Sequence, residues 1–265
     1  MVTAEPSSGA HALAFTVAYD GGAFSGFARQ PGLPTVQRRL EGALSVALRR
    51  DVVTAVAGRT DAGVHALGNV VSCDALGDEP GDDALLRSLN ALVGDGIAVR
   101  EIRRARAGFS ARFDAIQREY RYRLVSGRVP PLFLRSTAHW VHRPLDVDAM
   151  REASACLVGE QDFRSFCVSA SAQGKRTFRR VDAIEISAEE HLGERCTVVR
   201  VLGNAFLHSM VRVVVGSLIE VGSGRRDPAW LAGALAACQR TAAGPTAPAH
   251  GLTLWHVEYR DGVWL

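Results

Sequence analysis

The chain has 265 residues, of which 47% are hydrophobic and 22% charged, a composition typical of a globular protein with one large or two modest domains. Its 31 Lys and Arg residues against 28 Asp and Glu leave a net charge of only +3, so bulk charge alone does not indicate a nucleic-acid partner. The five scattered cysteines contain no C-x-x-C pair, which disfavours a disulfide framework and a structural zinc site and fits a reducing cytoplasm. We expect no signal peptide, and no apolar run approaches the ~20 residues that a membrane span needs.

The first half of the chain predicts one cycle of strands and helices. Residues 1–11 are small and polar and are expected to be loose, and an apolar strand follows at 12–20. Residues 35–50 predict an amphipathic helix, because Val36, Leu40 and Leu44 recur every four residues and Thr35 can cap its start. Strands are predicted at 52–58 and 68–73, a helix at 82–93 and a strand at 97–105.

The second half predicts a similar cycle. Strands are expected at 118–125 and 139–143, a helix at 146–160, paired strands at 179–190 and 195–206, helices at 207–222 and 228–238, and a closing strand at 251–259. Helices on one side of mostly antiparallel sheets make an α+β protein. We therefore predict two α/β halves, residues 12–107 and 108–265.

The stretch "AGRTDAGVHA" (57–66) places one carboxylate, Asp61, between Arg59 and His65 in a loop between two apolar strands. An Asx-turn is the simplest interpretation of an Asp beside Gly. The open loop tip, the glycines on both sides and two basic neighbours that can keep Asp61 ionised also suit a functional carboxylate. Such a group can be a nucleophile, a general base or a metal ligand, and the stretch does not distinguish these roles.

Basic and aromatic residues gather in the segment 100–123. It holds eight arginines against three acids, interleaved with Phe109, Phe113, Tyr120 and Tyr122. Arginine forks bind phosphate and aromatic rings stack on bases, so this pattern favours RNA or DNA over a merely solvated strand edge. A second cluster surrounds Phe178 and supports the same interpretation; it consists of Lys175, Arg176, Arg179 and Arg180.

Two further features leave alternatives open. Tyr120 and Tyr122 share one strand face, where core packing is expected for at least one, while the other can stack on a base or move a proton. In the helix predicted at 207–222, His208 and Arg212 are four residues apart and would share a face, from which Arg212 can pair with a carboxylate or reach solvent.

Other chemistries lack support in the sequence. Nucleotide-binding loops and a serine nucleophile elbow are absent. The stretch "HWVH" (139–142) makes a poor metal site because positions i and i+3 of a strand face opposite ways.

Six motifs in order resemble one known family. "AGRTDAGVHALGNVV" looks like the signature of the TruA family of tRNA pseudouridine synthases, and "YDGGAFSGFARQ" followed by "TVQ" resembles its opening segment. "FSARFDAIQREYRYRL", "EQDFRSF", "NAFLHSMVRVVVGSLIEVG" and "APAHGLTLWHVEY" follow as the family pattern expects. Ser110, Phe27 and Ala28 depart from residues that are commoner in the family, and residues 91–99 lack a usual Pro.

This resemblance implies an enzyme that isomerises uridine to pseudouridine at positions 38, 39 and 40 of the tRNA anticodon stem-loop. It implies no metal, nucleotide or other cofactor, a homodimer in the cytoplasm, and two RRM-like halves with a joined, mostly antiparallel sheet and a basic cleft. The family's catalytic aspartate falls on Asp61, its active-site tyrosine on Tyr120, and the arginine that partners the carboxylate on Arg212.

Other residues complete the expected site. We expect Arg59 to fill the space of the flipped nucleotide or to hold the flipped strand, and Arg29, Arg112 and Arg121 to contact RNA. Asp61 would attack C1′ of the ribose or C6 of the base, or deprotonate the sugar to give a glycal. The alternatives are a non-catalytic RNA-binding protein on the same scaffold and a hydrolase, which would need a second acid or a metal beside Asp61.

Overall fold

The computed structural model describes residues 11–265, apart from the side chain of Ser171. Most of the loose terminus predicted at 1–11 therefore lies outside the described residues. The chain forms two compact units: unit 1 runs to Ile116 and takes in Leu254–Leu265, and unit 2 is Gln117–Thr253. Within residues 11–265, no helix is long and apolar enough to cross a membrane.

Unit 1 follows the predicted order of strand, helix, two strands, helix and strand. Its elements are β1 (His11–Tyr19), α1 (Val36–Ala47), β2 (Ala55–Val56), β3 (His65–Ala75), α2 (Asp82–Leu92) and β4 (Ile97–Arg106), joined by β10 (Leu252–Tyr259). The sheet order is β4-β1-β3-β10, with β2 on β3 and with β1 antiparallel to both of its neighbours. Gly68 permits the close approach of β10 to β3, because a Cβ there would lie 2.5 Å from the carbonyl oxygen of Trp255.

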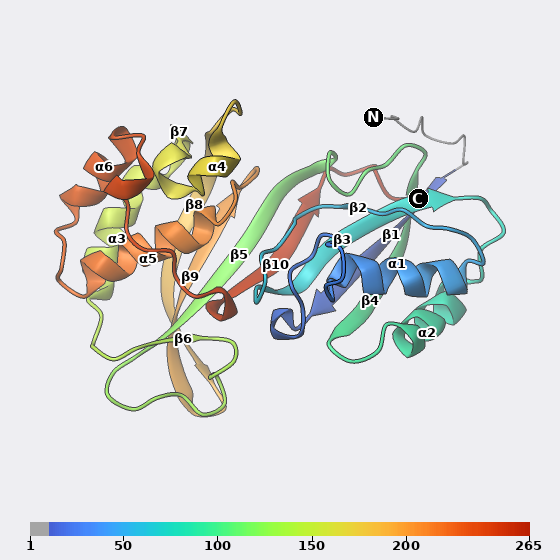
Figure 1. Cartoon of the computed structure of the whole chain (residues 1–265), viewed down its shortest axis with the longest axis horizontal. Coiled ribbons are helices and arrows are strands. Elements are labelled where there is room, and N and C mark those ends of the chain that lie inside the picture. The colour runs from blue at the N-terminus through green and yellow to red at the C-terminus, as the bar shows by residue number, and fades with distance from the viewer. Residues whose placement is uncertain (1–10) are drawn as a thin grey trace. The chain divides into compact units, whose positions relative to one another are not determined.

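The core of unit 1 forms between β1 and its helices. Leu13, Phe15 and Val17 of β1 are fully buried, as are Leu40 and Leu44 of α1. The helices α1 and α2 pack against each other on one face of the sheet (Figure 1). The predicted cap of α1 is confirmed, since the side chain of Thr35 accepts a hydrogen bond from the backbone N–H of Arg38. The strand predicted at 52–58 is reduced to the two residues of β2.

In unit 2 the strands β5, β9, β8 and β7 are neighbours in that order, each antiparallel to the next, and β6 pairs with β5 in parallel. Its elements are β5 (Ala115–Ser126), β6 (His139–Val141), α3 (Val147–Ser154), β7 (Gly159–Asp162), α4 (Ser169–Ala172), β8 (Phe178–His191), β9 (Glu194–Gly203), α5 (Met210–Gly222) and α6 (Ala229–Ala236). The helix predicted at 146–160 ends early: α3 stops at Ser154, the 3₁₀ turn Ala155–Leu157 follows, and Gly159, with a positive φ of 105°, begins β7. The helices α3, α5 and α6 gather on the same side of β8 and β9 (Figure 1).

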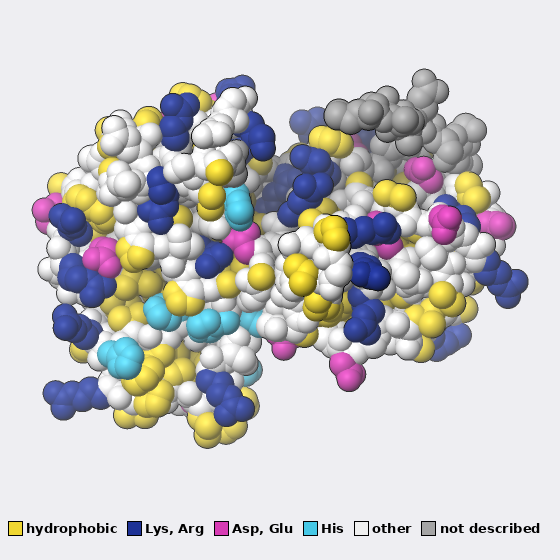
Figure 2. Space-filling view, in the orientation of Figure 1, with side chains coloured by type: hydrophobic (Ala, Val, Ile, Leu, Met, Phe, Trp, Pro, Cys, Tyr) yellow, Lys and Arg dark blue, Asp and Glu magenta, His cyan; other side chains and the backbone are white. Residues whose placement is uncertain are grey.

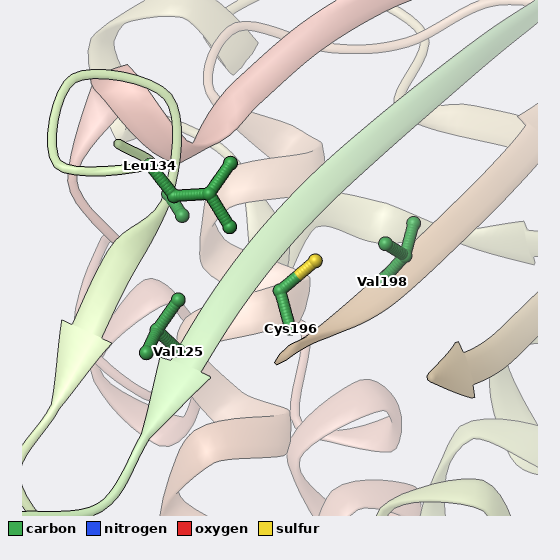
Figure 3. Close-up of a cluster of buried hydrophobic side chains, with 5 residues drawn as sticks. Val125, Leu134, Cys196 and Val198 are labelled. Atoms are coloured by element: carbon green, nitrogen blue, oxygen red, sulfur yellow. The ribbon is translucent and has the colours of Figure 1, made fainter. Parts of the chain in front are cut away.

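A small apolar cluster joins β5, β9 and the loop before β6. Val125, Leu134, Ala138, Cys196 and Val198 are all buried there, with Trp140 packed against them (Figure 3). The α+β prediction is confirmed in both units: each combines helices with a mostly antiparallel sheet.

Candidate active site

Asp61 lies on the connection between β2 and β3, which the sequence predicts as a loop. The backbone N–H of Val64 donates to the carbonyl of Asp61 (3.1 Å), and Gly63 has a φ of 79°, so residues 61–64 form a tight turn. Asp61 is partly buried, whereas Arg59 is exposed. The turn therefore presents a carboxylate with an exposed guanidinium two residues away.

The loop after β1 packs directly on this turn. The N–H of Phe27 donates to the carbonyl of Thr60 (3.1 Å), and Phe27 is fully buried with its ring 6.1 Å from that of Tyr19. Gly26 has a φ of 97°, and a Cβ there would lie 3.1 Å from the oxygen of Thr60. A side chain at Gly26 would thus be strained and crowded against the loop that carries Asp61.

A buried polar network supports the base of the Asp61 loop. The hydroxyl of Tyr19 lies 2.8 Å from Oγ1 of Thr60, and Nδ2 of Asn69 donates to Tyr19 Oη (3.1 Å). Asn69, which is fully buried, also binds both backbone groups of Gly58: Nδ2 donates to the carbonyl (2.8 Å) and Oδ1 accepts from the N–H (3.3 Å). Buried polar groups that satisfy each other in this way hold a loop in one conformation.

Neither Tyr19 nor Asn69 was singled out from the sequence. A polar residue inside the apolar run "GNVVSC" was the available signal for Asn69. Its partners Tyr19 and Gly58 lie 50 and 11 positions away along the chain, so only the folded structure joins them.

His65 anchors the turn that follows β1. Its Nδ1 lies 3.2 Å from the backbone N of Gly21 and 3.2 Å from Oδ1 of Asp20. The N–H of Gly21 can only donate, so Nδ1 of His65 accepts from it. That His65 and Arg59 help to keep Asp61 ionised remains a prediction.

Tyr120 and Tyr122 are both buried on β5, in unit 2. Tyr122 is fully buried and its hydroxyl donates to the carbonyl of Pro248 (2.8 Å), which confirms a core position for one of the pair. Burial raises the pKa of Tyr122, and the positive charge of Arg212 opposes that rise. Tyr120 is 8% exposed and its ring stands edge-on to Phe206, with centroids 5.0 Å apart.

Arg212 lies in the first turn of α5 and is partly buried. Its Nε donates to the carbonyl of Ala247 (2.8 Å), whose own N–H donates to the carbonyl of Arg212 (3.0 Å). The shared helical face expected for His208 and Arg212 is wrong, because Ser209 adopts a left-handed φ of 59° and the helix begins only at Met210. The structure instead brings Arg212 near Tyr122.

The three arginines expected to contact RNA have different surroundings. Arg29 forms an ion pair with the buried carboxylate of Glu41. Arg112 is exposed, and its guanidinium carbon lies 5.1 Å from the ring centre of Phe113, which is itself 80% exposed. An exposed guanidinium beside an exposed ring suits phosphate binding and base stacking.

Arg121 has acidic partners on its own sheet. Its Nε donates to Glu119 (2.7 Å), and Nη1 lies 3.6 Å from Glu189. Burial pushes the pKa of Glu119 upward, but hydrogen bonds from Arg200 and Arg121 outweigh it and hold the pKa below its ordinary value. Arg121 therefore stabilises a carboxylate within unit 2, whether or not it also contacts RNA.

Comparison with known proteins identifies the family. A sequence model of the family described as tRNA pseudouridine synthase matches residues 153–260. The chain is 44% identical over 247 residues to tRNA pseudouridine synthase A of Brevibacillus brevis, covering 93% of this chain and 99% of the relative. The chain belongs to the tRNA pseudouridine synthase family. Similar relatives occur in Bacillus velezensis (44% identical; 92% of this chain and 97% of the relative) and Neisseria gonorrhoeae (43% identical; 93% and 91%).

Membership of the tRNA pseudouridine synthase family makes the protein an isomerase that modifies RNA. The resemblance seen in the sequence motifs is thereby confirmed at the level of the family. Of the residues assigned roles from those motifs, Asp61, Arg59, Arg29 and Arg112 lie in unit 1, and Tyr120, Arg121 and Arg212 lie in unit 2.

Proposed function

We propose that this protein converts uridine to pseudouridine at positions 38, 39 and 40 of the tRNA anticodon stem-loop, with Asp61 as the nucleophile. The observation that carries the proposal is that buried hydrogen bonds of Tyr19, Thr60 and Asn69 hold the loop whose tight turn carries the Asp61 carboxylate. A catalytic group must be held within a narrow range of positions, and buried hydrogen bonds supply that restraint.

The isomerisation exchanges one bond to the ribose for another. The target uridine first leaves its stack at a cost of about a few kcal/mol, which phosphate contacts and stacking offset. The N1–C1′ bond breaks, the uracil turns, C5 bonds to C1′, and the proton of C5 is released while N1 gains one. Asp61 starts the sequence by attack at C1′ or C6, or by deprotonating the sugar at C2′ to form a glycal. Its bond to C1′ breaks when C5 attacks that carbon, its bond to C6 breaks after C5 has joined C1′, and in the glycal route the proton returns to C2′.

Three residues are proposed to bind the substrate. Tyr120 would stack on the uracil and assist removal of the C5 proton. Arg212 would bind the reacting nucleotide, and the exposed Arg59 would hold the strand from which that nucleotide is turned out.

Arg29, Arg112 and Arg121 are proposed RNA contacts, among which exposed Arg112 beside exposed Phe113 has the most suitable surroundings. We expect the protein to act as a homodimer in the cytoplasm without a cofactor. Light scattering, which measures the mass of the particle in solution, tests the homodimer.

The test follows the C5 proton, since tRNA carrying [5-³H]uridine releases tritium when pseudouridine forms. Asp61→Asn keeps the shape of the side chain but removes its charge, and should lower release by roughly 10⁴- to 10⁶-fold, the range for loss of a residue from a catalytic unit. Asp51→Asn makes the same change at an exposed aspartate ahead of β2 and should leave the rate unchanged. Near-native release by Asp61→Asn would show that the catalytic assignment is wrong.

Substrates and Tyr120 variants refine the test. Three tRNA transcripts with a single uridine at position 38, 39 or 40 report which positions are modified. Tyr120→Phe should reduce turnover less than Tyr120→Leu if stacking is its main role, and equal losses would assign the role to the hydroxyl. A wild-type protein that binds tRNA but releases no tritium would be a non-catalytic RNA-binding protein.

A further inference from the structure

Three arginines from separate segments of unit 2 meet at the start of β8. Arg164 lies in the 3₁₀ turn Phe163–Phe166, Arg179 is the second residue of β8, and Arg240 begins the 3₁₀ turn Arg240–Ala242. Two hydrogen bonds next to these residues tie the segments together. The N–H of Phe163 donates to the carbonyl of Thr177 (3.2 Å), and the N–H of Gln239 donates to Oγ of Ser165 (2.8 Å).

The guanidinium groups of this arginine cluster are held largely by neutral oxygens. Nη1 of Arg179 donates to the carbonyls of Arg176 (3.1 Å) and Phe178 (2.6 Å). Arg240 donates to the carbonyl of Gly244 (2.9 Å) and to the hydroxyl of Thr246 (3.1 Å). Such bonds fix the orientation of a guanidinium without neutralising its charge.

The acidic contribution is small. Nη2 of Arg164 lies 3.9 Å from Asp162, whose other oxygen accepts the backbone N–H of Arg164 (3.0 Å). The same groups act on the buried thiol of Cys167: burial raises its pKa most, Asp162 adds to the rise, and Arg164, Arg179 and Arg240 each oppose it. One acid among three arginines leaves an excess of positive charge at this point.

Two buried donors in the cluster lack a hydrogen-bond partner within the part of the chain that the structure describes. They are Nε of Arg179 and Oγ1 of Thr177, and Thr177 is only 1% exposed. Thr177 directly precedes β8 and Arg179 is the second residue of that strand, so the two donors are close along the chain. Unsatisfied buried polar groups are costly, by about 1–3 kcal/mol each, and an anion that accepts from both would remove that cost.

We propose that the cluster of Arg164, Thr177, Arg179 and Arg240 binds a backbone phosphate of RNA, away from the reacting nucleotide. The guanidinium fork matches phosphate geometry, and the three arginines are partly exposed and so reachable from solvent. The choice of an RNA phosphate over a free anion rests on the neighbouring surface. Phe178 is 47% exposed beside Arg179 and offers a ring for stacking, and Figure 2 shows several basic side chains at the end of unit 2 where β7 and α4 lie.

This inference rests on the proposed function for the identity of the RNA, which is the tRNA substrate. Arg179→Gln should weaken tRNA binding by roughly tenfold and lower the slope of log K against log salt by about 0.7–0.9, the value for one phosphate contact. The turnover rate at saturating tRNA should stay unchanged. Arg195→Gln is the matched control, because Arg195 is 90% exposed at the β8–β9 hairpin and lies 3.8 Å from its acidic partner Glu190.

Arg164→Gln is a second variant, used in case Arg179→Gln does not fold. Arg164 is half exposed, so Arg164→Gln leaves the packing intact and should weaken tRNA binding with the same change of salt slope. Arg179→Lys keeps the charge but loses the fork and the Nε donor, and should restore part of the affinity.

The outcomes separate this site from the proposed function. Unchanged affinity and salt slope in both Gln variants overturn the phosphate site, even if the wild-type protein forms pseudouridine. Weaker binding in both variants supports the site, even if no pseudouridine forms and the proposed function fails. A last experiment measures the Tm of the wild type and of Arg179→Gln with added inorganic phosphate. If phosphate raises the Tm of the wild type only, while both proteins bind tRNA equally, the site binds free phosphate and the RNA assignment is overturned.

Discussion

Replacing Asn69 by alanine tests whether the buried network holds the Asp61 loop. The substitution removes the donor to the carbonyl of Gly58, the acceptor of its N–H, and the donor to the hydroxyl of Tyr19. A buried group that loses its partner costs about 1–3 kcal/mol, but Gly58 is only partly buried and water can replace some of its bonds. We therefore expect the free energy of unfolding to fall by about 2–4 kcal/mol in Asn69→Ala.

Asn90 provides a control with the same geometry and a different environment. Its side chain also binds both backbone groups of one residue, donating to the carbonyl of Val99 (2.8 Å) and accepting from its N–H (3.0 Å), yet Asn90 is exposed. Asn90→Ala leaves the two backbone groups of Val99 unpaired but breaks no buried side-chain bond like that of Asn69 to Tyr19, so it should cost about 1 kcal/mol less than Asn69→Ala. Equal losses in the two variants would refute the argument that burial makes the Asn69 network important.

Urea unfolding followed by circular dichroism measures both losses, provided the m-value is unchanged. Hydrogen exchange of peptides over residues 55–72 then shows whether the loss lies in the Asp61 loop, which matters because the chain has two compact units. Tyr19→Phe combined with Asn69→Ala should show a coupling of at least about 0.5 kcal/mol, since the two side chains share a hydrogen bond.

Three further predictions concern other parts of the fold. Glu194 accepts three backbone N–H groups, and that of Leu132 contributes most to a pKa held below the ordinary value of 4.5. This stabilisation is present above pH 4.5 and is lost as the pH falls through the depressed pKa. Glu194→Gln should therefore make the free energy of unfolding fall less steeply with acid, as measured by urea unfolding between pH 3 and 6 (about one to two units either side of that value). Gly251→Ala places a Cβ 2.6 Å from the buried ring of Tyr122 and should lower the free energy of unfolding by about 1–3 kcal/mol in the same assay, and an unchanged value would contradict the packing described here. Burial raises the pKa of Cys73 to about 12, so its thiol should resist thiol reagents at neutral pH and react only when urea unfolds the protein; rapid labelling of the native protein would show that it is accessible.

The sequence alone determined the features that depend on local spacing. The four-residue recurrence from Val36 and the capping position of Thr35 predicted α1 because a helix buries one face and needs a partner for its first N–H groups. The apolar runs on either side of Asp61 predicted two strands with a loop between them, because continuous apolar runs bounded by glycines are typical of buried strands. The ordered motifs were sufficient to indicate the family.

The spacing of apolar and basic side chains predicted helices at 146–160 and 207–222 that the structure shortens. The apolar spacing of 146–160 predicted one helix, but α3 ends at Ser154 and the 3₁₀ turn Ala155–Leu157 leads to β7, which begins at Gly159 with its positive φ. Likewise, Ser209 in a left-handed conformation separates His208 from α5, so two residues four apart do not share a helical face. Side-chain periodicity carries no information about these local backbone conformations.

Only the tertiary structure decided which distant residues support the site. The pairing of β10 with β3, the ion pair of Arg29 with Glu41, and the hydrogen bond of Asn69 to Tyr19 all join segments through burial rather than through sequence proximity. Side-chain periodicity states which face of an element is apolar but not what covers that face. The partners of a buried polar group are fixed only when the whole core packs, because the cost of leaving that group unsatisfied is incurred only once water is excluded.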